Sequence, residues 1–126
     1  MRDLLIIGTG GFIGAVLRYL AVLSMQVFKS KTSIPLGTLL VNVLGCLLIG
    51  FLATLAENGK WLSAESRNFL LVGILGAFTT FSTFGYESMS LLKGGLNLHF
   101  ALNIGLQLLL GMAAVWGGMR LGGLVR

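Results

Sequence analysis

Within an apolar run from Phe69 to Leu92 lies the segment Gly73-Ile-Leu-Gly76-Ala-Phe78-Thr79-Thr80-Phe81-Ser82-Thr83-Phe84-Gly85. The run is long enough to cross a bilayer as a helix, which takes about 20 apolar residues. The segment itself suits a plain helix poorly, because glycine is a weak helix former and threonine is stiff at χ1. Irregular backbone at membrane depth survives only where protein or a water-filled path covers it. We therefore predict a helix broken mid-membrane; an intact helix whose hydroxyls bond back one turn is the alternative.

The composition indicates an integral membrane protein. The 126 residues are 56% hydrophobic and only 10% charged, and their mean hydropathy is +0.93. A soluble domain of this size could not bury so much apolar surface. The net charge of +5 comes from nine Lys and Arg residues that are scattered singly, so we expect a lipid bilayer around the chain and no nucleic-acid partner.

Four transmembrane spans are predicted, at about residues 4–28, 34–56, 67–92 and 96–119. The connections are short: Ser63 before Glu65 marks a helix start, and Gly94-Gly95 marks a tight turn. No soluble domain fits between the spans. We therefore expect residues 1–126 to form one all-α, four-helix transmembrane domain with the third helix broken.

Positive charge divides almost evenly between the two ends of the predicted bundle. The side that holds both termini collects Arg2, Lys60, Arg67, Arg120 and Arg126, and the other side collects Lys29, Lys31 and Lys93. The positive-inside rule orients a chain only when this asymmetry is clear. Such a chain could insert either way up, and two opposed copies would form an antiparallel, dual-topology homodimer.

Uncharged polar side chains recur in three of the four spans. Each span contributes one polar face: Thr38 and Asn42; Thr79, Thr80, Ser82 and Thr83; Asn103 and Gln107. Hydrogen bonds between packed helices would account for any one of these faces. Three together favour a polar pathway.

Two charged residues lie inside predicted spans. Arg18 is a cation that we expect to face the bundle interior, a partner or a water-filled vestibule, with snorkelling to the interface as the alternative. Glu87, one turn beyond Phe84, is the only acid well inside a span. It could serve as a proton or cation site, or it could pair with a donor near the membrane edge.

The sequence gives little support for nucleotide binding, a disulfide or catalysis. The stretch Gly8-Thr-Gly-Gly-Phe-Ile-Gly14 lacks the third glycine and the later acid of a dinucleotide fingerprint, and it suits close helix contact instead. The single Cys46 excludes an intrachain disulfide. His99 stands alone, and no nucleophile has a base in reach by spacing, so we do not expect an enzyme.

The chain resembles a known family, the small fluoride channels of the Fluc (CrcB) type. Three motifs carry the resemblance: Gly8-x-Gly10-Gly11-x-x-Gly14-Ala15-x-x-Arg18, Gly37-Thr38-Leu-x-Val-Asn42, and Gly76-Ala-Phe78-Thr79-Thr80-Phe81-Ser82-Thr83-Phe84-x-x-Glu87. The similarity covers essentially the whole chain, and the third motif is the specific one. The resemblance implies passive fluoride export, and hence fluoride resistance, by a dual-topology homodimer with two pores in the bacterial cytoplasmic (inner) membrane.

The resemblance also implies roles for single residues. Phe81 and Phe84 would line the pore, and aromatic edges can face an anion without a fixed charge. The remaining pore-lining positions would be Asn42, as a donor to the anion, with Ser82, Thr83, Asn103 and Gln107. Arg18 and Glu87 would lie at the vestibules. The backbone carbonyls of Gly76 and Thr79, from both subunits, would bind a structural sodium ion.

Two other functions are compatible with a four-span chain. A proton-coupled small multidrug-type exporter would use Glu87 as its embedded acid. A structural membrane assembly subunit would use the polar faces for packing alone, so that Asn42→Ala would alter assembly but no flux.

Overall fold

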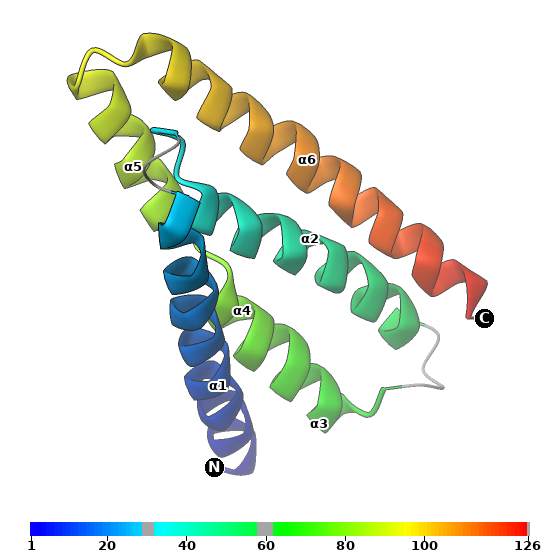
Figure 1. The fold of residues 1–126 in the computed structure, drawn as a ribbon. Helices are drawn as coiled ribbons and strands as arrows, with labels where there is room; N and C mark the ends of the chain where they lie inside the picture. Colours follow the sequence, from blue (N-terminus) through cyan, green and yellow to red (C-terminus); the bar gives the residue numbers. More distant parts are fainter. Residues whose placement is uncertain (29–31, 58–61, 126) are drawn as a thin grey trace.

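The computed structural model describes residues 1–28, 32–57 and 62–125 (Figure 1), and these ranges are helical apart from the connections. Four helical stretches are long and apolar enough to cross a membrane: Arg2–Met25, Leu36–Glu57, Ala64–Lys93 and Asn97–Leu124. The prediction of an all-helical chain with four spans is confirmed, and the architecture is that of a multi-pass membrane protein. Four residues of the charge comparison lie outside the described ranges: Lys29, Lys31, Lys60 and Arg126.

Three of the spans are continuous and one is composite. The continuous spans are α1 (Arg2–Met25), which runs into a 3₁₀ turn at Gln26–Phe28, α2 (Leu36–Glu57) and α6 (Asn97–Leu124). The composite third span consists of α3 (Ala64–Arg67), a π-helical stretch (Asn68–Leu75), α4 (Gly76–Phe78) and α5 (Phe81–Lys93). Helix α6 continues past the expected end near residue 119, because its last turns still pack against α2 through Gly122.

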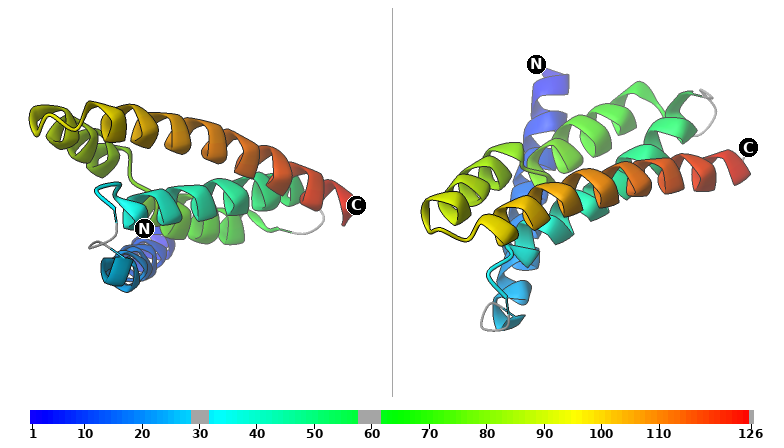
Figure 2. Two further views of the ribbon diagram at one scale, coloured as in Figure 1. Left: turned by 45° about the horizontal axis from the view of Figure 1, so that its top comes forward. Right: turned by 90° about the horizontal axis from the view of Figure 1, so that it is seen from above.

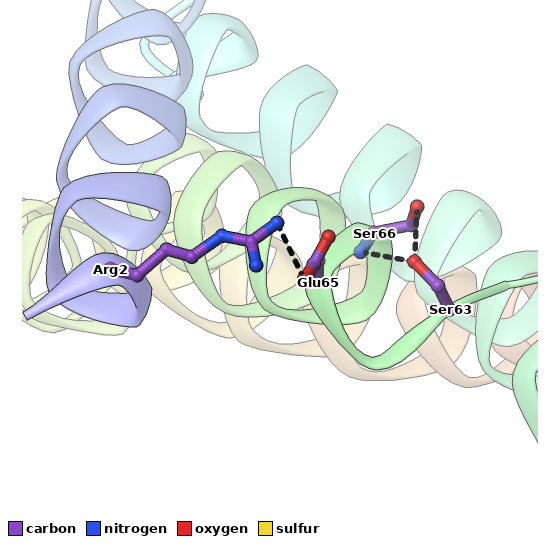
Figure 3. A network of polar contacts seen from close by, with 4 residues as sticks. All are labelled: Arg2, Ser63, Glu65 and Ser66. Carbon is purple, nitrogen blue, oxygen red and sulfur yellow. Dashed lines mark hydrogen bonds and ion pairs between the residues drawn. The ribbon is translucent and has the colours of Figure 1, made fainter.

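The short connections are set by local chemistry. The Ser63 hydroxyl accepts a hydrogen bond from the Ser66 backbone N–H at 3.2 Å and so caps α3. Beside this cap, Arg2 forms an ion pair with Glu65 at 2.7 Å and links the start of α1 to α3 (Figure 3). The turn between α5 and α6 uses Gly95 at φ 75°, a backbone conformation that suits glycine.

Helix α1 crosses the third span at close range (Figure 1). A Cβ atom on Gly10 would lie 2.6 Å from the Phe69 carbonyl oxygen, and one on Gly14 would overlap the Ile74 carbonyl. The absence of side chains at these two positions therefore allows the two backbones to touch, as small residues do between membrane helices.

Helices α2 and α6 run parallel and side by side, as both figures of the whole chain show (Figures 1 and 2). A Cβ on Gly50 would overlap the Val115 carbonyl, and a Cβ on Gly118 would overlap the Leu47 carbonyl. Toward one end of the bundle, the start of α1 lies beside α3, and the end of α6 lies beside the end of α2 (Figure 1). The segment 32–35 and the α5–α6 turn lie at the opposite end.

Candidate functional site

The third span is interrupted at Thr79 and Thr80. Thr79 has φ −83° and ψ 158°, and Thr80 has φ −152° and ψ 113°, so both are extended between α4 and α5. The Thr79 hydroxyl donates back to the Leu75 carbonyl at 3.1 Å, while the Thr80 hydroxyl accepts from the Thr83 backbone N–H at 3.2 Å. One threonine therefore finishes the first helix segment and the other caps the second.

The Asn42 side chain of α2 pairs with the backbone of this break. Its Oδ1 accepts from the Thr80 N–H at 2.9 Å, and its Nδ2 donates to the Thr80 carbonyl oxygen at 3.1 Å. An amide can pair with a peptide unit in both directions, because it carries a donor and an acceptor side by side. Asn42 therefore replaces the helical acceptor that the Thr80 N–H loses, and it also donates to the carbonyl of this N-cap residue.

Gln107 of α6 joins the same cluster. Its Oε1 accepts from Asn42 Nδ2 at 3.1 Å, which fixes the orientation of the Gln107 amide. The Gln107 side chain is buried, and its Nε2 has no hydrogen-bond partner among the described residues. The Asn42 amide, expected to donate to an anion, donates here to protein acceptors, and the free donor belongs to Gln107.

A second polar pair lies one helical turn before Gln107 on α6. Asn103 is fully buried and donates to the Ser88 hydroxyl at 3.0 Å, and that hydroxyl donates to the Phe84 carbonyl at 2.8 Å. The Asn103 Oδ1 atom has no partner in the described part of the chain. Ser88 was absent from the predicted site. Ser88 follows Phe84 by one turn on α5, and this spacing could have indicated that it belongs to the site. A serine within a helix, however, usually hydrogen-bonds to its own helix.

The aromatic pair lies at the start of α5. The Phe81 and Phe84 rings meet edge to face, with centroids 5.6 Å apart and planes at 64°. Phe84 is half-buried, whereas Phe81 is 81% exposed in the single chain. Ser82 and Thr83 are also exposed, and their hydroxyls lie 3.3 and 2.9 Å from that of Thr80.

Arg18 reaches the break from α1. Its half-buried guanidinium donates to the Thr79 carbonyl at 3.4 Å, across 61 positions of sequence. This contact points the cation toward the bundle interior rather than toward the interface. Arg18 on α1 therefore binds Thr79, and Asn42 on α2 binds Thr80.

A cavity of about 580 Å³ opens between the end of α1, the start of α2 and α5. Its polar lining includes Glu87, Thr38 and Ser90, and apolar side chains such as Val22 and Leu91 form the rest. The Oε2 atom of Glu87 is buried without a partner among the described residues. Thr38 lies one turn before Asn42, so the cavity wall and the break share one face of α2.

The break also leaves backbone oxygens that suit a hard cation. Because the Thr80 N–H donates to Asn42, it does not return to the Gly76 carbonyl, its acceptor in a continuous helix. Carbonyl oxygens freed in this way suit an alkali ion such as sodium. The Thr79 carbonyl already accepts from Arg18, so Gly76 fits this role better than Thr79 does. No group of three His, Cys, Asp or Glu residues that could bind a metal occurs within the ranges the structure describes.

Comparison with known proteins places the chain in a family. The family described as "CrcB-like protein, Camphor Resistance (CrcB)" matches residues 5–119. A Campylobacter jejuni protein named "Fluoride-specific ion channel FluC" is 50% identical over 118 residues, which cover 94% of this chain and 95% of the relative. A relative named as a FluC protein from Nitratidesulfovibrio vulgaris is 47% identical over 99% of this chain and 100% of its own length. Another, from Methanosarcina acetivorans, is 46% identical over 94% of this chain and 88% of its own length. The chain belongs to the CrcB-like protein family.

Proposed function

We propose that this protein is a fluoride channel that lets fluoride leave the cytoplasm passively, down its electrochemical gradient. The names of the relatives support this function. The observation that carries it is a chain of uncharged polar groups from the cavity to the break. The groups, in order, are Thr38, then Ser88 with Asn103, then Asn42 with Gln107 and Thr80.

This chain of groups suits an anion that must shed water and still move on. Hydroxyl and amide donors replace lost hydration, and because none of the groups just named carries a fixed charge, they do not hold the anion tightly. The Nε2 atom of Gln107, which has no partner in the part of the chain that the structure describes, is the donor best placed to meet the ion, and Asn42 fixes its orientation. Beyond the break, the edges of the Phe81 and Phe84 rings offer weak positive charge.

The direction of transport follows from the acid chemistry of fluoride. Neutral HF crosses membranes and dissociates in the less acidic cytoplasm, where the anion is trapped. A negative membrane potential then drives the anion outward through any selective pore. We therefore place the protein in the bacterial cytoplasmic (inner) membrane, where such a pore confers fluoride resistance.

The functional unit in this proposal is an antiparallel, dual-topology homodimer with two pores. The near balance of positive charge between the two ends of the sequence supports insertion in both orientations. The exposure of Phe81 also supports a dimer, because this motif phenylalanine, which is 81% exposed in one chain, would contact the second copy. The break would then lie at mid-depth near the shared axis.

A structural sodium ion at that axis is part of the proposal. The Gly76 carbonyl, and the Thr79 carbonyl once Arg18 releases it, would bind the ion from each copy. When bound, the ion would supply positive charge to backbone oxygens that would otherwise face each other across the dimer. In this chain, the Asn42 and Arg18 side chains fix the backbone that presents those oxygens.

Fluoride efflux from proteoliposomes tests the proposal. Potassium with valinomycin sets the voltage, and chloride efflux runs in parallel as the selectivity control. We expect rapid fluoride-only efflux from the wild type and its loss in Phe81→Ile and in Asn42→Ala. A folded, dimeric wild-type protein that released no fluoride would refute the channel.

Glu87 supports one other function, a proton-coupled exporter, because its Oε2 atom is buried in the cavity wall and has no partner among the described residues. The two functions differ in their driving force. A channel conducts fluoride under a clamped voltage with equal pH on both sides, whereas an exporter needs the proton gradient. Transport of an organic cation that required the gradient and was abolished by Glu87→Gln would establish the exporter.

A further inference from the structure

A second hollow, of about 450 Å³, lies far from the polar path, where α2 and α6 end side by side (Figure 1). It is lined by Thr54, Glu57, Met119, Arg120, Gly123 and Leu124. Gly123 keeps it open, because a Cβ atom built there meets nothing within 4 Å. The volume falls in the range of small-molecule sites.

Helix lengths place this hollow at the membrane surface. Helix α6 rises about 35 Å from Asn97 to Arg120, and the hydrocarbon core is about 30 Å thick. Helix α2, with 22 residues, spans about the same thickness and ends at Glu57. Trp116, one turn before Arg120, is 63% exposed, as expected for an aromatic anchor at headgroup level.

The two charges of the hollow have opposite signs and do not neutralise each other. Arg120 stacks on Trp116, with its guanidinium carbon 5.2 Å from the ring centroid, which leaves the N–H edge of the guanidinium free to donate. Glu57 is exposed on the neighbouring helix. Within residues 1–28, 32–57 and 62–125, no ion pair joins Glu57 to Arg120.

We propose that this hollow binds the headgroup of a phosphatidylethanolamine molecule from the surrounding bilayer. The phosphate accepts from the Arg120 guanidinium, and the primary ammonium group donates to the Glu57 carboxylate. Met119, which is 50% exposed and precedes Arg120 on α6, contacts the upper part of the acyl chains. An anionic headgroup without an amine meets repulsion from Glu57, and a choline headgroup has no N–H to donate.

Quenching of Trp116 fluorescence can measure which lipid lies in the hollow. Replacement of Trp61, the other of the two tryptophans, by Phe leaves Trp116 as the only tryptophan in the full-length chain. This protein is reconstituted in phosphatidylcholine vesicles with increasing fractions of one lipid brominated in its acyl chains, which quenches nearby fluorescence. The brominated lipid is phosphatidylethanolamine, phosphatidylglycerol or phosphatidylcholine. We expect phosphatidylethanolamine to be favoured at Trp116 by about threefold, the strength of exposed charge pairs.

Four variants decide whether the site has the proposed chemistry. Arg120→Gln should abolish the preference, and Glu57→Gln should remove the discrimination against phosphatidylglycerol. Gly123→Leu should fill the hollow and abolish the preference without changing a charge, while Gly105→Leu, at another open position of α6, should preserve it. Equal quenching by all three lipids, or a preference that survives in Arg120→Gln, overturns the proposal. So does the absence of quenching by any of them, which would show that another protein surface covers the hollow.

Discussion

The side-chain amide of Asn42 and the peptide backbone of Thr80 form a two-way hydrogen-bonded pair, with distances of 2.9 and 3.1 Å. The pair joins the middle of one continuous helix to the extended residues of an interrupted one. It satisfies a backbone N–H that has no helical acceptor, and it adds a second donor to the carbonyl of Thr80, the residue that caps the start of α5. Asn42 therefore maintains the break, and through Gln107 it also orients an unpaired donor beside it.

Replacing Asn42 by Ala should lower stability and stop fluoride efflux together. The Thr80 N–H would be left unsatisfied in a buried residue, which costs about 1–3 kcal/mol, so the thermal midpoint in detergent should fall measurably. Asn97→Ala, at the exposed start of α6, is the matched control and should change neither property. An Asn42→Ala protein of unchanged stability would show that the pair does not hold the break.

Exchange of Phe81 for Ile should stop fluoride efflux and leave the monomer fold intact. The ring is 81% exposed, so its loss removes little packing within one chain, whereas an aliphatic side chain lacks the positive edge of a ring. Phe12→Ile changes an aromatic residue of α1 that is 73% exposed, and it should conduct like the wild type. Equal efflux from the two variants would remove Phe81 from the pathway.

The crossing of α1 with the third span should tolerate no side chain at Gly14. A methyl group there would overlap the Ile74 carbonyl, and such overpacking costs about 1–3 kcal/mol. Gly11 lies on the same helix with open space around it, so Gly11→Ala should be neutral or stabilising by up to about 1 kcal/mol. Thermal unfolding of the two variants in the same detergent compares them directly, and equal midpoints would contradict the close contact.

Removal of sodium should weaken the assembled protein. If carbonyls at the break share the ion, exchange of sodium for N-methylglucamine should lower the thermal midpoint and favour monomers on size-exclusion chromatography, because a ligand of the folded state stabilises it by mass action. Potassium serves as the control for ionic strength. Identical midpoints in all three salts would argue that the freed Gly76 carbonyl has another partner.

The Asn103 and Ser88 pair should act as one unit. Asn103→Leu and Ser88→Ala should each slow fluoride efflux, and the double variant should be little slower than either single one, since contacting residues are not additive. Additive losses in a double-mutant cycle would show that the two side chains act separately.

Much of the fold could be predicted because bilayer thickness and hydropathy determine it. The four spans, the Ser63 cap and the turn at Gly95 each depend on neighbouring residues in the sequence, and all four spans are present. The π-helical stretch at Asn68–Leu75 was not predicted. The stretch contains no proline that would indicate irregular helix geometry. Its one glycine, Gly73, does not indicate it either, because that glycine allows the close contact with α1.

The site residues could be proposed from their types, but their partners could not. Asn42 and Gln107 are 65 positions apart, and Arg18 and Thr79 are 61 apart, so only the packed helices bring each pair together. The sequence also left undecided whether Thr79 and Thr80 would bond back to an intact helix or break it. The break is stabilised because Asn42 supplies from another helix the acceptor that the Thr80 N–H would have had in a continuous helix.

The interruption at Thr79 and Thr80 has an electrostatic consequence. The helical run that starts at Ala64 ends at Phe78 with its negative dipole end, and α5 begins at Phe81 with its positive dipole end. At the two extended residues, the C-terminal end of one helix, which attracts cations, therefore lies beside the N-terminal end of the next, which attracts anions. Neither helix terminus carries an ionised side chain. A substitution that restored a straight helix would cancel both ends at once, so any binding of cation and anion at this point must be lost together.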